Sequence, residues 1–150
     1  NIMWAGMVAH NNIVGVGRDQ DWNSHGIEHE LSALYDCAHG AGLAVIMPAW
    51  MEYVMNHDVM RFAQVATRVW GCQMNFANPE ITAKEGIGKF RQFLSNIGMP
   101  INFAQLGAKE SDIPKLVKSF GIGDGETGGF VHLKAKDVEN IYKIAAHAQL

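Results

Sequence analysis

The sequence contains few cysteines and lacks any long run of apolar residues. Its 2 cysteines, Cys37 and Cys72, are too few and too widely spaced for a disulfide framework or a CxxC site. Reduced thiols, the usual state in the cytosol, are therefore expected. The longest apolar stretch, residues 41–50, is too short to span a membrane, and no signal peptide is recognisable. We accordingly predict a cytoplasmic protein without a membrane partner.

Positive charge is also sparse. The chain carries 12 Lys and Arg residues against 15 Asp and Glu residues, a formal net charge of −3, and its basic residues form no cluster. Nucleic acids and anionic membranes bind to basic surfaces, so we expect neither as a partner. Apolar residues make up 48% of the 150 residues, enough for the core of one domain. Charged residues make up only 18%, which would suit a domain whose surface is partly covered by another.

Alternation of apolar and polar residues, which is typical of half-buried strands, nowhere extends beyond four residues. Apolar residues recur instead at helical spacing, and Asp58 and Asn78-Pro79 are typical helix starts. The sequence therefore predicts an all-α fold. Expected helices cover residues 2–10, 41–55, 59–70, a segment from Pro79 to about residue 97, a short segment ending at Phe120, and residues 138–148. One further helix, capped by Asn23 or Ser24, carries two histidines.

Proline and glycine mark one possible helix break and two possible phosphate-binding turns. Pro48 is expected to kink or end the buried helix over residues 41–55. Gly15–Gly17 and Gly121–Gly125 are the candidates for a phosphate-binding turn. Neither lies between an apolar strand and a helix, as such turns do, so we expect neither to bind phosphate.

Three histidines lie close together in the sequence. His25 and His29 are four residues apart, which places them on one face of a helix, one turn apart. His39 follows His25 by 14 residues, a separation of ~21 Å on an unbroken helix at ~1.5 Å per residue. Imidazole nitrogens bind a metal ion at ~2.1 Å, so these two share an ion only if the chain turns back between them. The apolar pattern is interrupted over residues 35–40, which predicts that turn and a second helix after it.

Other interpretations of these residues stay open at this point. The two histidines of the first helix could lie at the surface or at the edge of the core without binding metal, and His29 could simply bond to a carbonyl. Carboxylates could orient the imidazoles, although solvated helix charges are the expected role; the candidates are Glu28, Glu30 and Asp36. Large aromatic residues could line a substrate channel, although core packing is expected; these are Trp22, Trp50 and Phe103. Four histidines have no partner at ligand spacing and are assigned no role: His10, His57, His132 and His147.

Residues 21–33 (DWNSHGIEHELSA) and 36–44 (DCAHGAGLA) resemble the histidine signature of the iron-containing (group III) alcohol dehydrogenases. The sequence of residues 26–31 (GIEHEL) is most similar to their butanol dehydrogenase branch. Matches at residues 3–5, 63–70 and 90–100 extend the resemblance over nearly the whole chain.

The resemblance implies roles for the three histidines. It implies that His25 and His39 bind the catalytic divalent metal ion. It further implies that His29 lies near the nicotinamide of the cofactor and helps to transfer a proton. Fe²⁺ and Zn²⁺ both suit such ligands, and the sequence does not choose between them. Substrate-binding residues are not identified.

The resemblance also implies a larger enzyme. Residues 1–150 would be one helical, metal-binding C-terminal domain of the two-domain dehydroquinate synthase-like fold. The implied partners are its own N-terminal nucleotide-binding domain, which holds NAD(P)H, and a second subunit in a homodimer. That other domain would supply an Asp and a His four residues apart as further ligands. Asp21 has this spacing to His25, but we expect Asp21 to begin the helix instead.

The implied activity is the NAD(P)H-dependent interconversion of small primary alcohols, such as butanol, and their aldehydes by metal-assisted hydride transfer. These 150 residues by themselves are expected to be inactive. Two alternatives remain at the level of sequence. One is a free-standing helical protein-interaction module without catalysis. The other is a relative of the zinc glycerol dehydrogenases, which share the two-domain plan.

Overall fold

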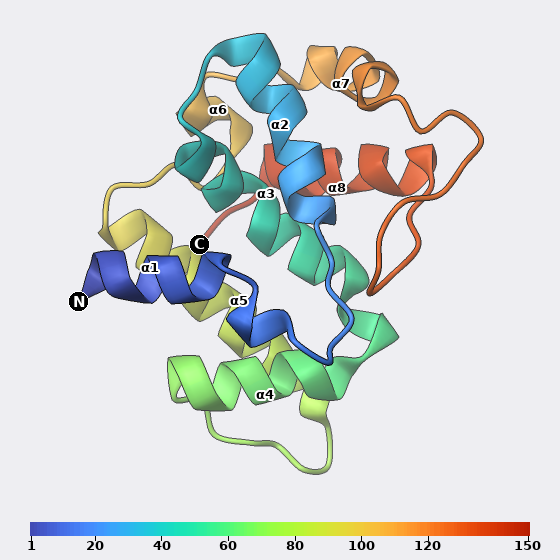
Figure 1. The fold of residues 1–150 in the computed structure, drawn as a ribbon. Coiled ribbons are helices and arrows are strands. Elements are labelled where there is room, and N and C mark those ends of the chain that lie inside the picture. The colour runs from blue at the N-terminus through green and yellow to red at the C-terminus, as the bar shows by residue number, and fades with distance from the viewer.

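Helices joined by loops make up the whole structure (Figure 1), a computed structural model that describes residues 1–150. No strand is present, and a single bridge joins Thr127 to Leu133. The all-α prediction is thus confirmed. The α-helices are α1 (Ile2–His10), α2 (Asn23–Tyr35), α3 (His39–Val54), α4 (Val59–Trp70), α5 (Pro79–Asn96), α6 (Phe103–Leu106), α7 (Ile113–Phe120) and α8 (Ala135–His147). The 3-10 helices are η1 (Ile13–Gly15), η2 (Met55–His57) and η3 (Glu110–Asp112).

Short polar side chains begin several of these helices. Asp58 accepts a hydrogen bond from the backbone N–H of Arg61 at 3.1 Å and so caps α4, as predicted. The start of α2 differs from the prediction, because Asn23 is already helical and neither Asn23 nor Ser24 is the cap. Asp21 accepts the backbone N–H of Asn23 at 2.8 Å instead, so it does stand at the start of this helix.

Some helix limits depart from the sequence-based expectation. α3 continues through Pro48 to Val54, so the proline does not end it. α8 begins at Ala135 rather than Val138, because the Asp137 carboxylate accepts the backbone N–H of Lys134 at 2.7 Å. The short helix α6 was not predicted; Asn102 caps it by accepting the N–H of Gln105 at 2.9 Å.

α2, α3 and α8 meet in the centre of the molecule and build most of its core. Tyr142 of α8 is fully buried, and its hydroxyl donates to the carbonyl of Ile27 in α2 at 2.7 Å. Burial raises the pKa of this phenol, which keeps it protonated as a donor. The same core includes Phe103, and Trp50 packs against it. Further core residues of these three helices are Leu31, Val45, Ile46, Ala49, Val138, Ile141 and Ala145.

α4 and α5 pack against each other beside this core (Figure 1), and Trp70 at the end of α4 lies against Phe90 of α5. Their backbones come close where Gly86 of α5 faces Ala66 of α4. α1, in contrast, contributes nothing to the core, since none of its residues is buried. No helix of the structure combines the length and the apolar character that crossing a membrane requires.

Candidate metal centre

A tight corner between α2 and α3 brings the three histidines together. α2 ends at Tyr35, the next residue Asp36 adopts a left-handed backbone with φ of 51°, and α3 begins with His39. The two helices pack side by side, so His39 lies against the face that carries His25 and His29. The ring centroids of His25 and His39 are 5.3 Å apart, and those of His29 and His39 are 5.2 Å apart. The predicted helix, turn and second helix are therefore present.

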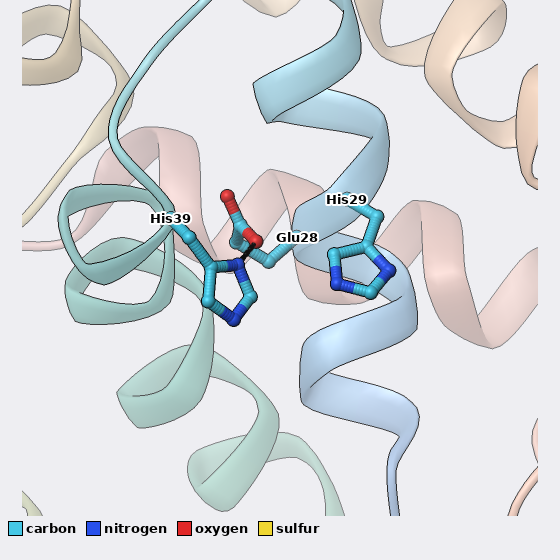
Figure 2. Close-up of side chains that lie close together, drawn as sticks. All are labelled: Glu28, His29 and His39. Atoms are coloured by element: carbon cyan, nitrogen blue, oxygen red, sulfur yellow. Dashed lines mark hydrogen bonds and ion pairs between the residues drawn. The ribbon is translucent and has the colours of Figure 1, made fainter.

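Glu28 lies between the two helices, next to His39 (Figure 2). Its side chain is completely buried, and one carboxylate oxygen contacts Nδ1 of His39 while the other accepts from the hydroxyl of Ser32. The prediction that Glu28 is a solvated helix charge was wrong. The periodicity offered a clue, because Glu28 falls on the stripe that also buries Ser24, Ile27 and Leu31.

The other two carboxylates behave as expected from the sequence. Glu30 is partly exposed and Asp36 is exposed, and neither bonds to an imidazole. The left-handed backbone conformation of Asp36 ends α2 and turns the chain towards α3. Of the three candidate carboxylates, only Glu28 reaches a histidine.

The environment of His25 favours a neutral imidazole. Partial burial lowers the pKa of His25, and the nearby rings of His39 and His29 lower it further because their protonated forms would repel a second positive charge. Glu28 acts in the opposite direction but does not reverse the shift. A neutral ring keeps a lone pair available, which is the form that binds metal ions.

The donor atoms of this cluster fit a divalent metal ion. Ligand atoms of Glu28, His29 and His39 all lie within 4.8 Å of one another. The predicted ligand His25 is not part of this group, although its ring centroid lies 5.3 Å from that of His39. Geometry alone would thus also allow Glu28 as a ligand. Both of its oxygens already have partners in the interior, however, whereas the imidazoles face outward: His29 is exposed and the His39 side chain is 46% exposed. Imidazole ligands suit Fe²⁺ or Zn²⁺.

An open cavity of about 520 Å³ lies next to His25. Its walls come from the end of α1, from η1 and from residues 18–22. Trp22 lies here edge-on to His25, with ring centroids 4.9 Å apart, and is 52% exposed. The expectation of core packing was therefore wrong for Trp22, because α1 and η1 leave its ring uncovered. It was correct for Phe103 and for Trp50.

The histidines without an assigned role are dispersed. His10 lines the cavity, and its ring centroid lies 6.2 Å from that of Trp22. No pattern in the sequence had indicated this position. His57 packs against Phe130 with ring centroids 5.0 Å apart. His147 is paired with Glu110 at 3.0 Å, and His132 is exposed.

Comparison with known proteins bears on this arrangement. The model of the Fe-containing alcohol dehydrogenase family, C-terminal, matches residues 1–146. NADH-dependent butanol dehydrogenase A of Clostridium acetobutylicum is 37% identical over 145 residues, which cover 95% of this chain and 37% of that protein. The NADPH-dependent aldehyde reductase YqhD of Escherichia coli is 33% identical over 118 residues, covering 79% of this chain and 30% of that protein.

Solved structures show the same similarity in three dimensions. NADH-dependent butanol dehydrogenase A from Thermotoga maritima superposes with a TM-score of 0.88 at 36% identity, covering 95% of this chain and 37% of that one. The aldehyde reductase YqhD from E. coli superposes with a TM-score of 0.88 at 28% identity, covering 96% of this chain and 38% of that one. The chain thus spans little more than a third of the length of these relatives.

Proposed function

The chain belongs to the iron-containing alcohol dehydrogenase family, and we propose that it is the metal-binding helical half of an NAD(P)H-dependent enzyme that interconverts small primary alcohols, such as butanol, and their aldehydes. Residues 1–150 then form one helical C-terminal domain. The observation that carries this proposal is the convergence of three imidazoles at one outward-facing corner. The activities for which the relatives are named, butanol dehydrogenase and aldehyde reductase, support the substrate class.

His25 and His39 are the proposed metal ligands. They come from two different helices, so the packing of α2 against α3 fixes the distance between them. The lowered pKa of His25 supports this role, because it keeps that ring free of a proton at neutral pH. When bound, Fe²⁺ or Zn²⁺ supplies Lewis-acid polarisation of the aldehyde oxygen.

His29 is the proposed proton carrier and the proposed contact to the nicotinamide. It lies one helical turn after His25, it is exposed, and its ring lies 5.2 Å from that of His39. An imidazole titrates near neutral pH, so it can give a proton to the alkoxide oxygen as the aldehyde is reduced and take it back in the reverse reaction. The exposure of His29 supports access by a cofactor held outside this chain.

An N-terminal nucleotide-binding domain, with NAD(P)H and two further ligands, is the proposed partner of this half. The large surplus of exposed apolar side chains on α1 supports such a partner: Ile2 and Met3 are 90% exposed and Trp4 is 68% exposed. The cavity beside His25 is a candidate position for the alcohol or aldehyde. Homodimer formation and a cytoplasmic location stay predictions.

Metal analysis of three histidine variants tests this function. In the enzyme that contains this chain, His25→Ala and His39→Ala should lose the bound ion and the aldehyde reductase activity together. His29→Ala should keep the ion but turn over ~10²–10⁴-fold more slowly, as expected for the loss of a general acid–base group. His147→Ala, which changes an exposed histidine paired with Glu110, is the control.

The measurements are metal content by elemental analysis and NAD(P)H oxidation with butyraldehyde. Full metal content in both the His25 and His39 variants would refute the metal site. Loss of the ion from the His29 variant alone would exchange the roles of ligand and proton carrier.

A further inference from the structure

Glu28 is the one acidic residue whose side chain is buried in this chain, with no exposed surface. A carboxylate is costly to remove from water unless hydrogen bonds replace the lost hydration. Its burial here therefore requires partners for its oxygens in the interior. The residue lies in the middle of α2, between His25 and His29 in the sequence, and its carboxylate lies beside the ring of His39 of α3 (Figure 2).

Each oxygen of this carboxylate has its own donor. Oε1 accepts from the Ser32 hydroxyl, one helical turn further along α2, and Oε2 contacts Nδ1 of His39. An ionised carboxylate can only accept, so the hydrogen of that contact lies on Nδ1 of His39. In a neutral ring with this hydrogen, the other nitrogen, Nε2, is the one with a free lone pair.

Gly42 provides independent evidence that the space is kept for this carboxylate. It lies in α3, about one turn after His39, and it faces Glu28. A Cβ atom at position 42 would overlap Oε1 of Glu28 and lie 2.7 Å from both Cγ and Cδ. Any larger residue would therefore push the carboxylate out of its place. Gly40, in the same helix, faces open space and has no such constraint.

We propose that Glu28 is a positioning residue that fixes His39 as the Nδ1–H tautomer, with Nε2 free to bind metal. The Ser32 hydroxyl holds the carboxylate by a hydrogen bond, and the missing side chain of Gly42 leaves the space that the carboxylate fills. This inference rests on the proposed function in one respect, namely that His39 is a ligand. Carboxylates that bond to the second nitrogen of a ligating histidine fix its ring and raise its affinity for the ion. The sequence left this role open for three carboxylates without choosing among them, and the family resemblance assigned it to none.

Two variants disturb the carboxylate by different routes. Glu28→Gln removes the charge and keeps the shape, whereas Gly42→Ala keeps every polar group and displaces the carboxylate. Each has a matched control in its own helix: Glu30→Gln in α2 and Gly40→Ala in α3. Co²⁺ is the probe, because its visible absorption reports coordination. Long-range ¹H–¹⁵N NMR spectra of the metal-free chain report the tautomer of His39 directly.

We expect Glu28→Gln and Gly42→Ala to weaken Co²⁺ binding by about 10- to 100-fold and both controls to leave it unchanged. The NMR spectra should show His39 as the Nδ1–H tautomer in the unaltered chain and as a mixture in the two variants. Unchanged Co²⁺ affinity in both variants, or an Nε2–H tautomer of His39 in the unaltered chain, would overturn the proposal. If Glu28→Gln does not fold, Gly42→Ala and the unaltered chain still decide.

The same experiment separates this inference from the proposed function. If His25→Ala and His39→Ala bind Co²⁺ as tightly as the unaltered chain, the proposed metal site is wrong. The tautomer measurement needs no metal, so it still confirms or refutes the role of Glu28 in that event.

Discussion

At the scale of single residues, His25 has an environment that disfavours its protonated form. Partial burial and the neighbouring rings of His39 and His29 lower its pKa from the ordinary value of 6.5, although Glu28 partly opposes them. A histidine with a lowered pKa binds fewer protons in the folded chain than in the unfolded chain. The sign follows: its contribution to stability is complete above about pH 6.5 and is lost as the pH falls from there towards the folded-state pKa.

This shift predicts the pH dependence of folding. In the metal-free chain, the melting temperature should fall as the pH is lowered from about 7.5 to about 5. The melting temperature of His25→Gln should fall less steeply, because Gln cannot take up a proton. Melting curves of both proteins at several pH values, recorded by circular dichroism, give the two slopes. A parallel fall of the two curves would show that His25 does not contribute.

At the scale of helices, the pair α4 and α5 is packed through a glycine. A Cβ atom at Gly86 would overlap the Ala66 Cβ and lie 2.8 Å from the Ala66 Cα in the facing backbone, whereas one at Gly88 would meet nothing within 4 Å. Both glycines are inside α5, where alanine is intrinsically favoured by about 1 kcal/mol. The same substitution should thus have opposite effects two residues apart.

Gly86→Ala should therefore lower the free energy of unfolding by about 1–3 kcal/mol, since overpacking forces the two helices apart. Gly88→Ala should raise it by up to about 1 kcal/mol. Urea unfolding followed by circular dichroism measures both. Stabilisation of the chain by Gly86→Ala would contradict the close approach of α4 and α5.

Local signals in the sequence predicted the elements better than they predicted burial. Caps and prolines act within a few residues, and they correctly placed the starts of α4 and α5. The burial of Glu28 depends on Gly42 in another helix, and the exposure of Trp22 depends on the path of η1. Such facts arise from packing between elements, which no local pattern contains.

The same distinction applies to the candidate site. The spacing of His25, His29 and His39 and the interrupted pattern before His39 sufficed to predict that a corner joins two helices there. The burial of Glu28 against His39 was not predicted, because a charged residue between two histidines is typical of a solvated helix surface. Its place on the apolar stripe with Ile27 and Leu31 was the one usable signal.

At the scale of the whole molecule, α1 contributes little to the folded body. None of its residues is buried, and Ile2, Met3 and Trp4 present most of their surface to solvent. Segments with few buried apolar contacts open locally with little cost in free energy. In this chain by itself, α1 should thus be the part that unfolds most readily.

Removing residues 1–10 should accordingly leave the melting temperature of the chain nearly unchanged. Ile141→Ala, which truncates a fully buried side chain of α8, is the contrasting control and should cost about 2–5 kcal/mol. Circular dichroism melting of the two variants, with hydrogen exchange of the α1 amides, makes the comparison. Strong protection of those amides would show that α1 is docked firmly.

The corner over Asp36–Ala38 also has a consequence for the order of folding. It closes the contact between His25 and His39 over 14 residues of chain, whereas the bond between Tyr142 and Ile27 joins residues 115 apart. The entropy lost on closing a loop grows with its length, and contacts between near neighbours form fastest. The two helices that carry the imidazoles can therefore meet early, before α8 has docked, and the later long-range contacts add to a histidine pair that is already assembled.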